Sequence, residues 1–107
     1  MKRVNIITRL RLLRIANSAI SKLNSEKNRT KPDWHEQTFG ALCYHLGKEN
    51  TELFDAVYTV KCDFEHVIDE CKDNINLPLM IADNAKRQLR KERREKNESR
   101  NRKYVKE

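Results

Sequence analysis

The sequence contains very little glycine or proline, with two residues of each among 107. Tight hairpin turns usually depend on glycine, and no stretch alternates apolar and polar residues over the length of a strand, so we expect few or no β-strands. Charged residues make up 36% of the chain, a share that suits exposed helix faces. These features predict one all-α domain with a modest core.

Cysteine is also scarce, with Cys43, Cys62 and Cys71 as an odd number that contains no C-x-x-C pair. A disulfide scaffold is therefore excluded, and a reducing compartment, the cytoplasm, is expected. A zinc site at Cys62, His66 and Cys71 is disfavoured because structural zinc normally has four ligands in closer pairs. The cysteines are instead expected to be small, mostly buried helix residues. No apolar run reaches the eighteen residues of a membrane span, so no membrane partner is expected.

The net charge of +7 conceals a strong segregation along the chain. Residues 1–31 hold nine Lys or Arg and one acid, whereas residues 32–85 hold three Lys or Arg and eleven acids. Residues 86–107 are basic again, with eleven Lys or Arg and four acids. An acidic centre suits a metal ion, and the basic ends suit an anionic partner, either nucleotide phosphates or nucleic acid.

Three helices account for most of the chain. The first is expected over 5–24, where apolar residues recur at helical spacing. Asp33 begins a capping box that predicts a second helix running to about Val60. Asp63 is the expected N-cap of a third helix. The turn between the second and third helices is so short that they must lie antiparallel.

The apolar residues of these helices exceed what three helices can bury. The first helix carries its stripe on one face, with Lys22 on the opposite, outward face. The stripe of the second helix is Leu42, Leu46, Leu53, Val57 and Val60. The third is apolar around its whole circumference over 75–82 and should be kinked at Pro78. We therefore expect a homodimer or homotetramer whose subunits complete an antiparallel four-helix bundle.

Two acidic pairs are the strongest functional signal. Glu49 and Glu52 lie three residues apart in the second helix, and Glu70 and Asp73 have the same spacing in the third. This spacing places both carboxylates of a pair on one helix face. Antiparallel packing would direct all four towards one volume, where their repulsion is best relieved by a hard divalent cation, Mg²⁺ or alternatively Mn²⁺.

The same stretch resembles a known family, the MazG-like all-α nucleoside triphosphate pyrophosphohydrolases, and in particular its phage-type members. Its motifs are E-x-x-E followed by E-x-x-D on adjacent helices. The likeness extends over L-x-x-x-L-x-x-E-x-x-E-L-x-x-A from Leu42 to Ala56, and over residues 69–76 and 80–85. An N-x-x-K-x-x-W pattern at Asn28, Lys31 and Trp34 precedes them. Two features depart from the family pattern: Lys72 and Asn74 replace small or apolar residues, and Pro78 lies within the second motif helix.

The resemblance implies hydrolysis of a (deoxy)nucleoside triphosphate to the monophosphate and pyrophosphate. Glu49, Glu52, Glu70 and Asp73 would be the metal ligands, and Glu52 or Glu49 would activate the attacking water. The expected substrate contacts come from three residues: Lys31 for a phosphate, Trp34 for the base, and Asn76 for the sugar or base. The resemblance also places the protein in the cytoplasm of a bacterium or a phage-infected cell.

The family-like domain is expected to span 1–88, and 89–107 to form a basic extension that is either helical or disordered. One alternative function is a small basic helical protein that binds nucleic acid or regulates without catalysis. Another is an assembly protein that keeps the bundle and has lost turnover. The charged residues would then form an ordinary solvated face.

Overall fold

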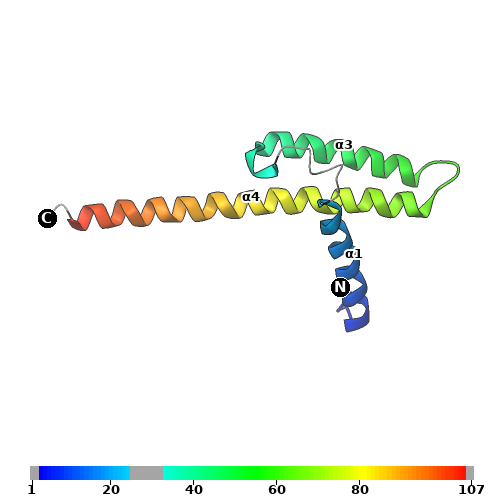
Figure 1. Ribbon diagram of the computed structural model, residues 1–107, viewed down its shortest axis with the longest axis horizontal. Coiled ribbons are helices and arrows are strands. Elements are labelled where there is room, and N and C mark those ends of the chain that lie inside the picture. The colour runs from blue at the N-terminus through cyan, green and yellow to red at the C-terminus, as the bar shows by residue number, and fades with distance from the viewer. Residues whose placement is uncertain (1–2, 25–32, 106–107) are drawn as a thin grey trace.

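The computed structural model of the chain describes residues 3–24 and 33–105, with side chains to residue 102. It contains helix α1 (Ile6–Lys22), the 3₁₀ turn η1 (Trp34–Glu36), helix α3 (Phe39–Val57) and helix α4 (Phe64–Val105). No strand occurs among the described residues, so the all-α prediction is confirmed. In Figure 1, α3 and α4 form a hairpin and α1 crosses α4 with its N-terminal end projecting away.

Helix α1 lies where its apolar spacing predicts. The N-cap is Asn5, whose Oδ1 accepts a 2.8 Å hydrogen bond from the Thr8 backbone N–H. Only the end of α1 near Lys22 is packed, because Ala19 is fully buried there. There the Asn76 side chain donates a 2.6 Å hydrogen bond from Nδ2 to the Ala19 carbonyl, which ties α1 to α4.

The predicted start of the second helix is wrong by five residues. Asp33 does act as a cap, because its carboxylate accepts from the His35 N–H at 3.0 Å, but it starts only the single turn η1. Gln37 is extended and ends that turn. Thr38 then caps α3, and its hydroxyl accepts from the Ala41 N–H at 3.1 Å. Two N-caps, Asp33 and Thr38, thus divide the segment that the sequence predicted to be one helix.

Helix α4 is longer and more regular than expected. Asp63 caps its start, as predicted, with Oδ1 accepting from the Glu65 N–H at 3.1 Å. The helix continues for 42 residues through Pro78, and Figure 1 shows no sharp bend there, contrary to the expected kink. Of the two alternatives for the C-terminal segment, the structure shows the helical extension as far as Val105.

The core of the isolated protomer is very small. Its only buried apolar residues within the described chain are Ala19, Leu42 and Ala56. The predicted apolar stripe of α3 does not extend to Val60. This residue is fully exposed because the helix ends at Val57. Segment 75–82 is likewise not covered on all sides; its only fully buried residue is the polar Asn76.

The overall dimensions agree with this small core. The accessible surface is 9518 Å², whereas a globular monomer of 12.8 kDa exposes about 6,300 Å². The radius of gyration is 19.4 Å, compared with about 13 Å for a compact domain of this length. The exposed surface includes the charged end of α4 after residue 85 and apolar residues of α1, where Ile6 is 71% exposed. No helix in the described ranges combines the length and the apolar character needed to cross a membrane.

The two caps before α3 lead to a stability prediction. Replacing Thr38 with Ala should lower the free energy of unfolding by about 1 kcal/mol, because the cap of a 19-residue helix is lost. Replacing Asp33 with Ala removes the cap of a three-residue turn and should cost less. Urea unfolding monitored by circular dichroism measures both values. A larger loss for Asp33→Ala would mean that Asp33 starts the long helix after all.

Candidate metal centre

The α3–α4 hairpin brings together carboxylates from both acidic pairs. Glu49 on α3 and Glu70 and Asp73 on α4 each offer one oxygen, and these three oxygens lie within 4.8 Å of one another. The antiparallel arrangement of the two helices is what places residues 49 and 70 side by side. We refer to these three residues as the carboxylate cluster.

Two oxygens of the carboxylate cluster are buried without a partner. Glu70 is 9% exposed, and neither its Oε2 nor the Oε2 of Glu49 has a hydrogen-bond partner among the described residues. A buried carboxylate oxygen that lacks a partner costs free energy, since it has lost its hydration without replacement. A hard cation held by oxygen ligands would satisfy both atoms, so the residues present fit Mg²⁺ or Mn²⁺.

The electrostatics of the carboxylate cluster favour protonation when no cation is bound. Burial, the charge of Asp73, a side-chain hydrogen bond with Glu52 and the charges of Glu52 and Glu70 raise the pKa of Glu49 to about 7. Burial, together with the charges of Glu52 and Asp73, also raises the pKa of Glu70. Both shifts arise because charged carboxylates are held close together and partly out of water. A bound divalent cation would reverse them, and cation binding should therefore release protons.

Glu52 lies beside the carboxylate cluster and not within it. It is exposed, and it is close enough to raise the pKa values of both Glu49 and Glu70. With Glu70 and His66 it lines a cleft of about 510 Å³ between α3 and α4. His66 Nε2 is 3.8 Å from Glu70 Oε1 at the edge of this cleft. The fourth predicted ligand therefore faces the space that a substrate could enter.

Lys22 is a residue of the centre that the sequence analysis placed wrongly. It was expected on the outward face of α1, but its Nζ lies 2.8 Å from Asp73 Oδ1 and 3.1 Å from Asp69 Oδ1. Burial acts to lower the pKa of Lys22, but hydrogen bonds to Asp73 and Asp69 outweigh it and the pKa is raised. The sequence held one indirect signal: residues 32–85 have only three Lys or Arg for eleven acids, so a cation from another segment was needed.

Asn74 is the second residue that sequence reasoning missed. Its Nδ2 donates to the Glu49 carbonyl at 3.0 Å and to the Glu70 carbonyl at 2.9 Å. One side chain thus fixes the spacing of the two helices at the level of the carboxylate cluster. Asn74 is also a position where the chain departs from the family pattern, and that departure was the available signal.

The three predicted substrate residues are not gathered at the carboxylate cluster. Lys31 lies outside the described residues. Asn76 is directed towards α1 through its bond to Ala19, although its Oδ1 is buried without a partner in the described structure. Trp34 lies in η1, where its Nε1 donates to Asp83 Oδ2 at 3.2 Å. Asp83 is ten residues beyond Asp73, or about 15 Å along α4.

The contacts of Trp34 belong to a second polar group that fastens η1 to α4. The Asp83 carboxylate also lies 2.7 Å from His35 Nε2, and Asn84 donates from Nδ2 to the Trp34 carbonyl at 2.9 Å. Hydrogen bonds from His35 and Trp34 lower the pKa of Asp83. These hydrogen bonds account for the position of Trp34, so no bound ligand is needed to explain it.

The cysteine expectations are partly corrected. Cys43 is exposed, and Cys62 and Cys71 are half-buried, so these residues are not mostly buried as predicted. Within the described residues the carboxylate cluster is the only group of three His, Cys, Asp or Glu side chains close enough to share an ion. Cys62, His66 and Cys71 are not brought together as such a group in the described chain.

The raised pKa of Glu49 predicts how stability depends on pH. Between its ordinary value of 4.5 and about 7, the folded state binds more protons than the unfolded state, so stability falls as pH rises. In EDTA above pH 7, Glu49→Gln should therefore be more stable than the parent by on the order of 1 kcal/mol, after allowance for solvent screening.

Below pH 4.5 the two proteins should have equal stability, because Glu49 is then protonated in both states. Glu92→Gln, on the exposed end of α4, is the control and should change stability by less than about 0.5 kcal/mol. Urea unfolding at a series of pH values measures the difference. A Glu49→Gln protein less stable than the parent at pH 8 would contradict the repulsion in the carboxylate cluster.

No family model, no curated protein and no solved structure matches this chain. A function therefore has to be inferred from the chemistry of the carboxylate cluster and from the two acidic motifs.

Proposed function

We propose that this chain is a Mg²⁺-dependent nucleoside triphosphate pyrophosphohydrolase that converts (d)NTP to (d)NMP and pyrophosphate. The observation that carries the proposal is the carboxylate cluster, in which Glu49 and Glu70 each keep one buried oxygen without a partner. The choice of substrate rests on the resemblance of the E-x-x-E and E-x-x-D motifs to the MazG-like family.

An acidic cleft would repel a triphosphate unless cations intervene. The cleft beside the carboxylate cluster is lined by Glu52, Asp55 and Glu70, with His66 as its one basic residue. A Mg²⁺-nucleotide complex removes this repulsion, because its cation can contact the carboxylates and the phosphates together. The sign of the cleft's charge therefore favours a metal-bound nucleotide over a free anion.

The residues of the centre have different roles in the proposed reaction. Glu49, Glu70 and Asp73 would hold Mg²⁺, which would supply Lewis acidity towards a phosphate oxygen and a bound water. Glu52 faces the cleft, and it is the residue we assign to orient and deprotonate the attacking water, with Glu49 as the alternative. Asn74 keeps the two helices at the correct spacing through its bonds to the carbonyls of Glu49 and Glu70.

The substrate contacts remain predictions from the sequence. Lys31 is assigned to a phosphate, Trp34 to the base, and Asn76 to the sugar or base. The contacts of Trp34 and Asn76 within the protomer show that both also hold the fold together. Substitution of either is expected to affect stability as well as substrate binding.

We further propose that the active form is a homodimer or homotetramer. Of the predicted apolar stripe of α1, Ile6, Leu10, Leu13 and Ile20 are exposed, and Leu23 is half-buried. The four exposed residues lie across the helix from Ala19, which packs against α4. The excess surface of the protomer, about 3,000 Å², is of the order that obligate subunit interfaces cover. A second copy that covered this stripe would complete a helical bundle.

The metal-centre assignment is tested by amide substitutions. Glu49→Gln, Glu70→Gln and Asp73→Asn should each lower Mg²⁺-dependent pyrophosphate release from a nucleotide panel at least about a hundredfold, because an amide replaces an anionic ligand poorly. Pyrophosphate and orthophosphate are quantified separately, since only pyrophosphate fits cleavage between the α and β phosphates.

Glu52→Gln separates the two roles proposed for the acids. It should lose turnover but retain Mn²⁺ binding, because Glu52 lies outside the carboxylate cluster. Glu36→Gln, exposed in η1, is the control and should keep the parent rate. Parent-like pyrophosphate release from all four variants of the centre, at Glu49, Glu52, Glu70 and Asp73, would contradict the proposed active site.

The oligomer is tested by light scattering at micromolar concentration. The parent should have a mass of at least twice 12.8 kDa. Leu10→Glu introduces a charge into the exposed stripe of α1 and should lower the mass or the stability, because a charge buried at an apolar interface is costly. Arg11→Glu, on the face opposite the stripe, should leave the mass unchanged. A folded parent protein of 12.8 kDa would contradict the proposed assembly.

A further inference from the structure

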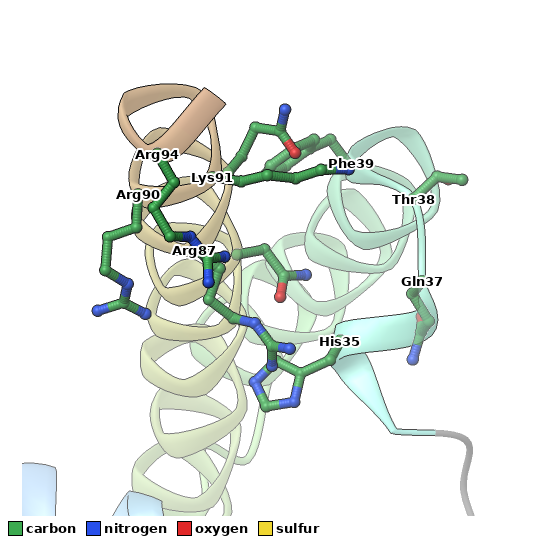
Figure 2. Close-up of a pocket in the computed structure, with 10 residues that line it drawn as sticks. His35, Gln37, Thr38, Phe39, Arg87, Arg90, Lys91 and Arg94 are labelled. Carbon is green, nitrogen blue, oxygen red and sulfur yellow. The ribbon is translucent and has the colours of Figure 1, made fainter. Parts of the chain in front are cut away.

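A second cleft lies at the other end of the hairpin. It has a volume of about 550 Å³, within the range of small-molecule and nucleotide sites, and lies between the segment from His35 to Phe39 and the second half of α4. Arg87 lies about 21 Å along α4 from Asp73, so this cleft is separate from the carboxylate cluster. Figure 2 shows its two walls and the gap between them.

One wall of this cleft is cationic. Four cations line it from α4, namely Arg87, Arg90, Lys91 and Arg94, and no carboxylate is among the lining residues. None of the four forms an ion pair within the described part of the chain. Arg87, Lys91 and Arg94 lie on one face of the helix because they are three, four or seven residues apart, and Arg90 lies at the edge of that face. Four cations without an ion pair on one wall attract an anion.

The opposite wall is suited to a nucleobase. Phe39 is 45% exposed at the first position of α3 and faces Lys91 across the gap in Figure 2. Aromatic rings that remain exposed beside cations are the usual stacking platforms for unpaired bases. The α3 N-terminus adds the positive end of a 19-residue helix to the same wall. Asn84 and Gln88 contribute amide groups that can donate to and accept from a base edge.

The surroundings favour a polyanion over a single nucleotide. The described end of α4 from residue 86 to residue 102 carries nine Lys or Arg and three acids and is exposed throughout. Such a field extends well past the cleft and raises the association rate of a long phosphate chain. A duplex would present its bases stacked and paired, so Phe39 could not reach a base face.

We propose that the cleft between Phe39 and α4 binds single-stranded nucleic acid, with Arg87, Lys91 and Arg94 on the phosphates and Phe39 stacked on a base. The site is independent of the proposed pyrophosphohydrolase activity, because it shares no residue with the carboxylate cluster. Its occupant is a strand of DNA or RNA, since nothing in the contacts described requires or excludes a 2′-hydroxyl.

The test is fluorescence anisotropy with labelled 12-nucleotide oligothymidylate and oligouridylate, in EDTA so that no metal-dependent hydrolysis occurs. The parent protein should bind both oligonucleotides with a salt-dependent affinity. The triple variant Arg87→Gln, Lys91→Gln, Arg94→Gln should bind at least tenfold more weakly. Its slope of log K against log salt should be about 2 units shallower, because each lost phosphate contact contributes about 0.7.

The chain offers a matched control on the opposite face of the same helix. Arg93→Gln, Lys96→Gln, Arg100→Gln removes two arginines and one lysine as well, at exposed positions that do not line the cleft. This variant should weaken binding less than threefold. Equal weakening by the two triple variants would overturn the proposal, because the attraction would then come from net charge alone. Circular dichroism establishes that both variants keep the parent helicity.

Three further arms test the strand and the base. Phe39→Leu should weaken oligonucleotide binding severalfold, since stacking on an aromatic ring contributes about 1–3 kcal/mol per base. A duplex of equal length and inorganic tripolyphosphate should compete at least tenfold less well than the unlabelled strand. Competition by tripolyphosphate as strong as that by the strand would overturn the proposal in favour of a small-anion site.

Glu70→Gln separates this proposal from the catalytic one. It should bind the oligonucleotide as the parent does, even though it is expected to lose pyrophosphate release. Failure of the parent to bind any strand at 50 mM salt would overturn the nucleic-acid site and leave the proposed enzyme untouched. Strand binding by a parent protein that releases no pyrophosphate would have the opposite meaning, because the proposed enzyme would then fail and the strand site would stand.

Discussion

Repulsion among partly buried carboxylates is the constraint on which the α3–α4 hairpin depends. Glu49, Glu70 and Asp73 are held within 4.8 Å of one another by two helices whose spacing is fixed by Asn74. Without a metal ion, proton uptake reduces the free-energy cost of holding these carboxylates together, since burial and neighbouring charges raise the pKa of Glu49 to about 7. Lys22 reduces it further through its contacts with Asp73 and Asp69. A hard cation is the ligand that would remove the remaining cost, which is why a metal centre fits these residues.

The separation of charge along the sequence becomes a separation in space. The acidic centre of the chain forms the carboxylate cluster and its cleft, and the basic segment after residue 85 forms the exposed half of α4. One helix thus carries an acidic end and a basic end, and the two clefts lie beside its different halves. The two clefts differ in the sign of their charge, because carboxylates line the first and Arg and Lys side chains line the second. We therefore expect them to take different ligands.

Residue spacing was sufficient to predict the regular elements and the meeting of the acidic pairs. Helix α1, the cap at Asp63 and the antiparallel packing of α3 and α4 follow from local patterns that act within a few residues. The start of α3 did not follow, because Asp33 and Thr38 are both good N-caps and only tertiary contacts decide between them. Lys22 and Asn74 were missed because their partners are 47 and 25 residues distant and the contacts depend on how the helices cross. The exposure of the α1 stripe was expected only in the sense that three helices could not bury all their apolar surface.

Paramagnetic broadening by Mn²⁺ gives a direct test of the proposal that the carboxylate cluster binds a divalent cation. In ¹⁵N-labelled protein at pH 8, substoichiometric Mn²⁺ should first broaden the amide signals of Glu49, Glu70 and Asp73 and their helical neighbours. Excess Mg²⁺ should restore these signals, because both ions prefer oxygen ligands. The amide signals of Arg87 and Arg94, on the other half of α4, should be affected least. Broadening centred elsewhere, or none at the carboxylate cluster, would contradict the claim.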